Sequence, residues 1–234
     1  MQRYFASVIN NDVNLSKEDE HHIIHVMRMK VGEHFEVVDH KIVYLCEISS
    51  LNPLSIVIKD KKEEDVELSS DVTLFFALAK GDKIDLVIQK ATEIGVNRII
   101  LFKSKRCVVN FDNKDIEKKL VRFNKIAKEA SEQCHRLIIP QIIGVVELKD
   151  IDKYLSDINY LAYEKEAGSN KDAIKVEPRK TISIMIGSEG GFDEDEVIFL
   201  NSKGFKNVSL GKRILRCETA AIYALSVLSY KLEN

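Results

Sequence analysis

The stretch between residues 182 and 228 constrains the fold of this chain more than any other. It opens with Ile182–Ile186, a short apolar, β-branched run that is typical of a strand buried on both faces. A loop with three glycines follows, and then a helical segment from 193 to 204, a second strand near 207–210 and a last helix from Cys217 to about Leu232. Two glycine-containing loops therefore leave the carboxyl ends of two strands, where open α/β sheets bind ligands.

Neither glycine loop matches a common phosphate-binding template, because G-x-x-x-x-G-K-[ST] and G-x-G-x-x-G are both absent. The first loop, Gly187–Gly191, is therefore also consistent with a tight turn and nothing more. The second loop, Gly211–Arg216, is more informative, because Arg213 and Arg216 alternate with apolar residues. This alternation predicts a pocket with an apolar floor and two rigid donors for a planar or anionic partner.

Strands alternate with helices from residue 72 onward. Val72–Ala79 and Arg98–Phe102 are typical of buried strands, and the segment between them has apolar residues at helical spacing up to Gly95. A strand–helix–strand unit of this length predicts a parallel pair with a right-handed crossover. We expect the alternation to continue with a helix over 115–134 and strands over 137–143 and 158–163. The pattern predicts an α/β domain with a mainly parallel sheet.

The N-terminal part of the chain has a different pattern. Short, partly alternating strand signals at 33–38, 42–48 and 54–58 are separated by turn residues, and Ser16 begins a possible helix reaching Met29. This part predicts a small β-rich module, most simply a compact barrel. A charged stretch between positions 61 and 71 marks the boundary, so we expect domains at 1–68 and 72–234.

Composition restricts the possible partners. The formal net charge of the 234 residues is −2, so binding to nucleic acid would depend on local basic patches and not on overall charge. The four cysteines are far apart and form no C-x-x-C pair, which favours free thiols in a reducing cytoplasm. No apolar run approaches the length that a membrane-spanning helix needs, and no signal peptide is evident, so we expect a cytoplasmic protein with no membrane association.

Three histidines near the N-terminus raise the question of a metal. His21 and His25 are four residues apart and could share one face of a helix. No third ligand of fixed spacing accompanies them, and no H-E-x-x-H is present. The sequence therefore predicts no metal site.

Two C-terminal motifs, Ile186–Phe192 and Leu210–Ala220, resemble the signature of the uridine-N3 methyltransferases of small-subunit ribosomal RNA, which belong to the SPOUT superfamily. The resemblance covers nearly the whole chain. Its further matches are Arg3–Phe5, His25–Gly32, Gln89–Val96, Glu132–Arg136 and Leu161–Glu164. One departure is Ser188, where the family usually has proline; without the fixed φ of proline we expect a looser loop and an effect on cofactor affinity.

The resemblance implies a SPOUT-type, trefoil-knotted α/β domain with a mainly parallel sheet, preceded by a small PUA-like β-barrel that binds RNA. From the residues alone an unknotted path would be expected. It also implies S-adenosyl-L-methionine as cofactor and a homodimer with its sites at the interface. The small residues of the last helix fit packing on its own sheet as well as on a second subunit.

The resemblance also implies roles for individual residues. The expected cofactor-binding residues are Leu161, Glu164, Ile186, Gly187, Glu189, Gly190, Gly191, Leu210, Gly211, Ile214 and Leu215. The expected RNA-binding residues are Arg3, Arg28, Lys30, Lys105, Arg106 and Arg136, although their charges are also consistent with ordinary solvated surface. The expected catalytic residues are Arg213, Arg216 and Glu218.

The implied reaction methylates N3 of a uridine in 16S ribosomal RNA or the assembled small subunit. That base must be unpaired or turned out of its helix, and it must lose its N3 proton. Arg213 and Arg216 could stabilise the resulting charge, bind an RNA phosphate or pair with Glu218. Glu189 or Glu218 could accept the proton. Two alternatives remain: a SPOUT ribose 2′-O methyltransferase, and a non-catalytic RNA-binding assembly factor on the same fold.

Overall fold

The computed structural model describes residues 1–109, 111, 113–166, 174–177 and 179–234 and divides into two compact units. The first unit comprises Met1–Glu67 together with Ser131–Ile138, and the second comprises Leu68–Ala130 together with Ile139–Asn234. The break at Glu67 falls inside the charged stretch of the sequence. The grouping of Ser131–Ile138 with the first unit has no counterpart in the domain ranges expected from the sequence.

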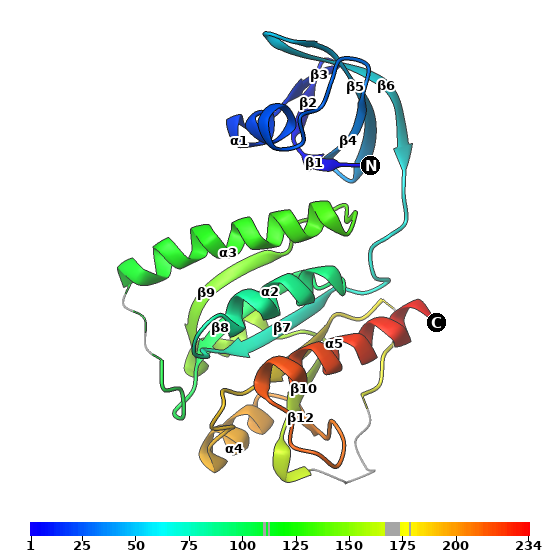
Figure 1. The fold of residues 1–234 in the computed structure, drawn as a ribbon. Helices are drawn as coiled ribbons and strands as arrows, with labels where there is room; N and C mark the ends of the chain where they lie inside the picture. The colour runs from blue at the N-terminus through cyan, green and yellow to red at the C-terminus, as the bar shows by residue number, and fades with distance from the viewer. Residues whose placement is uncertain (110, 112, 167–173, 178) are drawn as a thin grey trace. The chain divides into compact units, whose positions relative to one another are not determined.

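The first unit contains a four-stranded sheet in the order β1-β4-β5-β6 and a separate hairpin of β2 and β3 (Figure 1). β1 is parallel to β4, whereas β4 is antiparallel to β5 and β5 is antiparallel to β6. Buried side chains of Tyr4, Ile23 and Phe35 contribute to its core. The strands are β1 (Arg3–Phe5), β2 (Ser7–Ile9), β3 (Asp12–Asn14), β4 (His34–Asp39), β5 (Ile42–Leu51) and β6 (Leu54–Glu63).

The helix expected between Ser16 and Met29 is shorter than its pattern suggested. Ser16 caps α1 (Lys17–His21) by accepting a hydrogen bond from the Asp19 amide, and a π-helical turn, η1 (His22–Val26), follows. Arg28 then adopts a left-handed conformation with φ of 52°. Since non-glycine residues rarely adopt this conformation and cannot continue a helix in it, the helix ends there.

The second unit contains a six-stranded sheet in the order β12-β10-β11-β7-β8-β9. All neighbouring strands are parallel, which confirms the expected mainly parallel α/β fold. The strands are β7 (Val72–Ala77), β8 (Arg98–Lys103), β9 (Gln141–Glu147), β10 (Ile158–Ala162), β11 (Ile182–Ile186) and β12 (Phe205–Val208). The helices are α2 (Lys83–Glu93), α3 (Asn113–Gln133), which runs on into the first unit, α4 (Glu194–Ser202) and α5 (Cys217–Glu233), with short 3₁₀ turns η2 (Leu148–Tyr154) and η3 (Glu164–Glu166).

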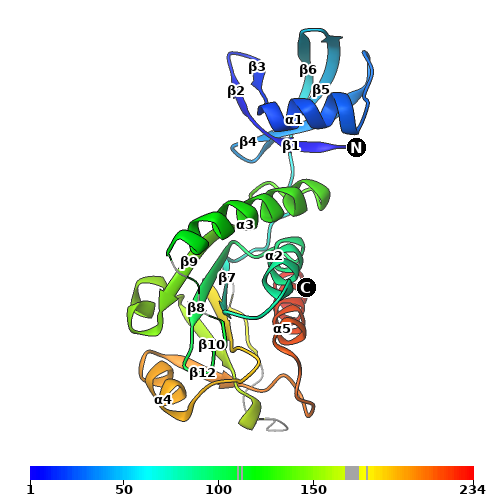
Figure 2. The same cartoon turned by 60° about the vertical axis from the view of Figure 1, so that its left-hand side comes forward.

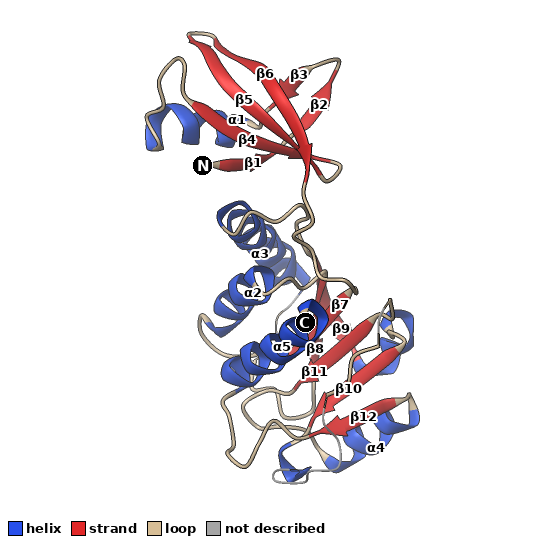
Figure 3. Ribbon diagram, turned by 90° about the vertical axis from the view of Figure 1, so that its right-hand side faces the viewer, coloured by secondary structure: helices blue, strands red, loops and turns tan. Residues whose placement is uncertain are grey.

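Helices cover both faces of this sheet. One face packs against α2, α3 and α5 through residues such as Leu74, Ile88 and Leu228, and the other packs against α4 and η2 through Phe75 and Leu200 (Figures 2 and 3). Alternate residues of one strand therefore belong to different cores, which is why β7 and β11 are buried at every position. Among the described residues no helix is long and apolar enough to cross a membrane.

One strand begins later than the sequence predicted. β9 starts at Gln141 and not at residue 137, because Leu137 is buried beside Val38 and Val43 of the first unit. The backbone amides of Leu137 and Ile138 both donate hydrogen bonds to Oε1 of Glu67, at 2.8 and 3.2 Å. These contacts divert the chain from the strand that its apolar residues suggested.

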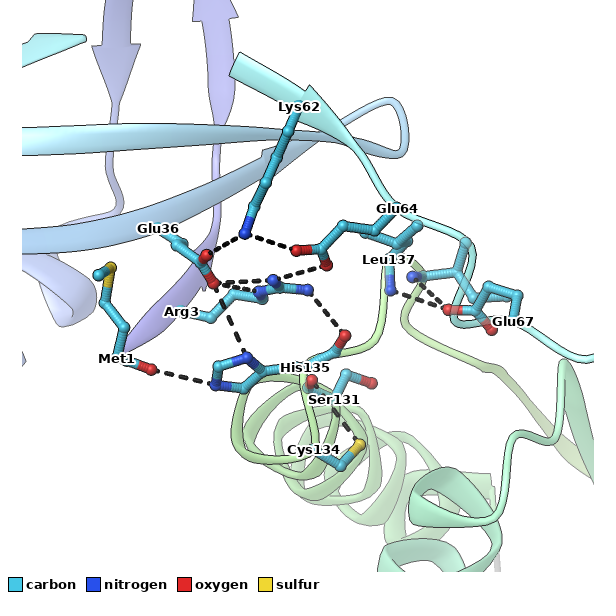
Figure 4. A network of polar contacts seen from close by, with 11 residues as sticks. Met1, Arg3, Glu36, Lys62, Glu64, Glu67, Ser131, Cys134, His135 and Leu137 are labelled. Carbon is cyan, nitrogen blue, oxygen red and sulfur yellow. Dashed lines mark hydrogen bonds and ion pairs between the residues drawn. The ribbon is translucent and has the colours of Figure 1, made fainter. Parts of the chain in front are cut away.

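A buried polar network ties Ser131–Ile138 to the strands of the first unit (Figure 4). The Arg3 guanidinium donates to Oε2 of Glu36 from Nη2 at 2.7 Å, to Oε2 of Glu64 at 2.8 Å and, from Nη1, to the carbonyl oxygen of His135 at 2.7 Å. Lys62 forms ion pairs with the same two carboxylates. Burial opposes ionisation of Glu36 and Glu64, but hydrogen bonds from Arg3 and Lys62 outweigh it and lower the pKa of both carboxyls.

Candidate active site

A cavity of about 480 Å³ lies at the carboxyl ends of strands on one side of the sheet of the second unit. Its walls come from the segments that follow β10, β11 and β12, three adjacent parallel strands, and from the start of α5. Lys83, at the start of α2 after β7, completes the lining. The position agrees with the rule that open α/β sheets bind ligands outside the carboxyl ends of their strands.

The first glycine loop is a tight turn with one side against Glu164. The Gly191 amide donates to the carbonyl oxygen of Ser188 at 2.9 Å, and Gly191 has φ of 67°. A Cβ atom on Gly191 would lie 2.7 Å from Oε1 of Glu164, and one on Gly187 would lie 3.0 Å from the Phe192 ring. Both the backbone angle and the close packing therefore require glycine at position 191.

Arg106, in the turn after β8, supports the same loop. Its Nη1 donates to the carbonyl oxygen of Gly190 at 3.1 Å, and a Cβ atom on Gly190 would lie only 2.9 Å from the Arg106 Cβ. In return the buried Ser188 hydroxyl donates to the Arg106 carbonyl oxygen at 3.3 Å. Because proline is missing at position 188, a looser backbone was expected there. The hydrogen bond of the Ser188 hydroxyl instead restrains the loop at this position.

The second loop forms another part of the wall. Ser209 Oγ accepts a hydrogen bond from the Gly211 amide at 3.2 Å, and Gly211 has φ of 115° with no atom within 4 Å of the place its Cβ would take. Arg213 and Arg216 line the cavity, and Ile214 is 83% exposed. Within the described residues neither guanidinium forms a hydrogen bond or ion pair, so both are available to a ligand. The backbone of Arg216 caps α5 in an extended conformation.

A lysine and two carboxylates form a charged cluster at the edge of the cavity. Lys83 Nζ lies 2.8 Å from Oε1 of Glu189 and 3.7 Å from Oε2 of Glu218. Burial opposes ionisation of Glu189, but hydrogen bonds from Lys83 and from backbone amides outweigh it and lower the pKa of this carboxyl. The Glu189 hydrogen bond likewise raises the pKa of Lys83. All three groups are therefore charged at neutral pH.

Cys217, the first residue of α5, also lines the cavity. Burial and its hydrogen bond to Glu218 raise the pKa of the thiol to about 12. The thiolate is the nucleophilic form of cysteine, so the raised pKa makes this thiol a poor nucleophile at neutral pH.

The structure brings together the predicted cofactor-binding residues with one exception. Leu161 is fully buried in the core on the α4 side and does not line the cavity, where Ala162 stands instead. Glu218 is also absent from the lining, whereas Arg213 and Arg216 are present. Lining residues that the sequence did not predict are Lys83, Ala162, Tyr163, Ser188, Phe192, Ser209, Cys217 and Ala220. Lys83 could have been found from Lys80-Gly81-Asp82, which marks the carboxyl end of the strand beside β11.

Two of the expected RNA-binding residues are buried and form ion pairs. Arg3 is 1% exposed and bound to Glu36 and Glu64. Arg136 is 4% exposed, and its Nε donates to Oε2 of Glu67 at 3.1 Å. A phosphate could reach either guanidinium only by displacing its carboxylate partners, so the structure argues against this role and contact of Arg3 and Arg136 with RNA stays an untested prediction.

The other expected RNA-binding residues lie nearer the surface. Arg28 and Lys30 belong to the first unit, next to the exposed side chains of Met27 and Val31. In the second unit Lys105 forms ion pairs with Asp193 and Asp195, and Arg106 supports the glycine loop. Contact of these four residues with RNA remains a prediction.

The N-terminal histidines include one close pair of rings. The rings of His21 and His25 lie 4.7 Å apart. Across the described part of the chain, no group of three or more histidine, cysteine, aspartate or glutamate side chains has the geometry to hold a metal ion.

Both units match known protein families. Residues 66–229 match the model of the RNA methyltransferase domain, and residues 15–61 match that of the RNA methyltransferase PUA domain. These matches agree with the predicted SPOUT-type domain and PUA-like barrel. The first model covers more than half of the chain, so it defines the family.

Relatives match over nearly their full length. The chain is 35% identical to ribosomal RNA small subunit methyltransferase E of Bacillus subtilis, over 100% of this chain and 98% of that protein. The enzyme of the same name from Mesomycoplasma hyopneumoniae is 36% identical over 87% and 88% of the two chains. The crystal structure of the Neisseria gonorrhoeae enzyme of that name, bound to S-adenosyl methionine, has a TM-score of 0.87 at 26% identity and covers 98% of this chain and 97% of its own. The cavity between two glycine loops, the two family models and these full-length relatives establish that the chain belongs to the RNA methyltransferase family that includes the small-subunit ribosomal RNA methyltransferases E.

Proposed function

We propose that this protein uses S-adenosyl-L-methionine to methylate N3 of a specific uridine in small-subunit (16S) ribosomal RNA. The observation that carries the proposal is the cavity that both glycine loops line at the carboxyl ends of β11 and β12. Family membership and the S-adenosyl methionine bound to the Neisseria relative support the choice of donor.

The residues of the cavity fit this donor. A volume of about 480 Å³ lies in the range of small-molecule sites, and the apolar side chains of Ile186, Leu210 and Leu215 suit an adenine ring. The carboxylates of Glu164 and Glu189 line a site for a ligand that carries a positive sulfonium and an ammonium group. When bound, the donor supplies an electrophilic methyl group attached to sulfur. The chain's task is then to align the uridine with it.

Arg213 and Arg216 suit the acceptor. A uridine that loses its N3 proton carries negative charge on N3, O2 and O4, and a guanidinium beside these atoms stabilises that charge. Both side chains line the cavity and have no hydrogen-bond or ion-pair partner among the described residues. We assign them to charge stabilisation in the reaction.

Glu189 and Glu218 suit proton removal less well. Their lowered pKa values make them weaker bases than ordinary carboxylates, and Lys83 lies beside both. In the proposed reaction the N3 proton therefore leaves to solvent, and these carboxylates shape the site electrostatically.

The proposal extends to oligomeric state and location. Tyr223 and Tyr230, seven positions apart on one face of α5, are 49% and 69% exposed. An exposed aromatic face on the helix that begins at the cavity suits a homodimer interface next to the active site. Ribosomal RNA as substrate and free thiols suit the cytoplasm.

The test of this function is mass spectrometry of 16S ribosomal RNA from cells that lack the protein. We expect one methyluridine to disappear and to return on complementation. Reverse transcription identifies the modified atom, because an N3-methyl group blocks base pairing and stops the polymerase, whereas a ribose 2′-O-methyl group mostly does not. Loss of a 2′-O-methyl group would identify the other type of SPOUT enzyme, and an unchanged RNA would favour the non-catalytic assembly factor.

A further inference from the structure

Lys83 connects two walls of the cavity that are distant from each other in the sequence. Its Nζ donates to Oε1 of Glu189 in the first glycine loop at 2.8 Å and lies 3.7 Å from Oε2 of Glu218 near the start of α5. We propose that Lys83 is a positioning residue that holds the Gly187–Gly191 loop against the N-terminus of α5 and so keeps the cavity in its ligand-binding shape. This inference rests on the proposed function, because it concerns the binding of the same donor.

The sheet topology makes this connection possible. β7 and β11 are neighbouring parallel strands, with Phe76 paired to Ile186, so the segments that follow them leave the sheet side by side. The Lys80 amide also donates to Oε1 of Glu189, at 3.2 Å. Both the backbone and the side chain of the segment after β7 therefore hold one carboxylate, and Gly190, which lines the cavity, follows that carboxylate directly.

The Lys83 ammonium group also offsets the repulsion between two neighbouring carboxylates. Glu189 and Glu218 lie within 4.0 Å of the same ammonium group, and their side chains are 31% and 15% exposed. Without Lys83 the two negative groups would share a partly desolvated edge, and the loop carrying Glu189 would lose its main contact on this side. We therefore expect the loop to move away from α5 when the cation is removed.

Two ligands of different charge distinguish a positioning role of Lys83 from a purely electrostatic effect of its ammonium group. Lys83 repels the cationic S-adenosylmethionine. If charge alone mattered, removing Lys83 would strengthen the binding of S-adenosylmethionine and leave the binding of the less positive S-adenosylhomocysteine unchanged. A positioning role predicts weaker binding of both ligands by a similar factor. From the worth of a hydrogen bond to a charged group, we expect a loss of about tenfold or more.

Calorimetry on the full-length protein with both ligands provides the test. Lys83→Met should weaken both ligands to a similar extent, and Lys83→Arg, which keeps a cation, should recover much of the affinity. Lys90→Met is the matched control, because Lys90 is on the same helix and pairs at 2.8 Å with Glu93, which does not line the cavity. If Lys83→Met does not fold, Lys83→Gln removes the same cation with a polar side chain.

The outcomes are distinct. Wild type that fails to bind S-adenosylmethionine would contradict the proposed function and this inference together. Wild-type binding with unchanged affinities in Lys83→Met would contradict only the role of Lys83. Tighter binding of S-adenosylmethionine by Lys83→Met, with unchanged binding of S-adenosylhomocysteine, would show that Lys83 acts through its charge and not as a positioning residue.

Discussion

The Arg106 guanidinium donates a hydrogen bond of 3.1 Å to the carbonyl oxygen of Gly190, although the two residues follow strands that are not adjacent in the sheet. The Ser188 hydroxyl returns a bond of 3.3 Å to the Arg106 carbonyl oxygen. Each segment thus holds the backbone of the other. The turn after β8 therefore supports the wall of the cavity, and the effect of serine at position 188 is to replace a rigid ring by a hydrogen bond.

Gly191→Ala should abolish or severely weaken binding of S-adenosylmethionine. A left-handed conformation costs a residue with a Cβ about 1–2 kcal/mol, and the new methyl group would also lie 2.7 Å from Oε1 of Glu164. Gly204→Ala is the control, because Gly204 has φ of 92° at the end of α4 with nothing within 4 Å of a Cβ. Calorimetry should show normal affinity for the control, and equal affinities for both variants would contradict the steric argument.

Arg216→Ala should lower kcat on small ribosomal subunits by roughly 10²–10³-fold, the usual effect of removing one donor to a developing negative charge. Lys212→Ala, in the same loop but outside the lining, should leave kcat unchanged. Steady-state kinetics with varied RNA concentration provide the measurement. An increase in KM at constant kcat would instead identify Arg216 as a phosphate-binding residue.

Arg136→Ala should reduce the free energy of unfolding by about 1.5–3 kcal/mol, because it removes the hydrogen bonds that Arg136 donates to the charged Glu67 in a partly buried ion pair. It should not change the salt dependence of RNA binding by the protein that remains folded. Lys30→Ala is the counterpart: we expect unchanged stability and, if Lys30 contacts a phosphate, a shallower salt dependence. A shallower dependence for Arg136→Ala would support the predicted role of Arg136 in RNA binding.

The thiols of Cys46 and Cys217 should resist iodoacetamide in the native protein at pH 8. Both are buried, and burial raises each pKa to about 12, so the reactive thiolate is scarce at that pH. Modification should increase as the pH approaches 12 or when guanidinium chloride unfolds the chain. Peptide mass spectrometry locates the label, and rapid labelling of Cys217 at pH 8 would show that the start of α5 opens.

Tyr223→Asp combined with Tyr230→Asp should convert the expected homodimer into a monomer. Charged residues on an apolar interface must be desolvated without partners, which association cannot compensate. Light scattering after size-exclusion chromatography gives the mass directly. Val121→Asp, on the exposed side of α3 in the same unit, tests whether any new surface charge has this effect. A monomeric wild type would contradict the dimer proposal.

Local patterns predicted the elements of the second unit well. β7 and β11 are buried at every position because both faces of the sheet are covered, and Asp193 and Glu196 form the expected capping box of α4. The two glycine loops were found because glycine at left-handed or crowded positions leaves a signal in the sequence itself.

Features that depend on distant pairs were missed. The contacts of the Lys83 side chain depend on β7 and β11 being neighbours in the sheet. Arg3 and Arg136 resembled surface cations in the sequence because their carboxylate partners are 33 and 69 residues away. Strand order, ion-pair partners and any threading of the chain are properties of the whole path. Periodicity within a short window of sequence cannot report them.

The return of Ser131–Ile138 to the first unit limits how this protein can be divided. A fragment that stops at residue 68 would lack the carbonyl group that accepts from Arg3 and the amides that donate to Glu67. Recombination at the apparent boundary would therefore join incompatible halves, even between close relatives. A viable chimaera has to exchange Ser131–Ile138, from the far end of α3, together with Met1–Glu67, because both segments belong to the first unit.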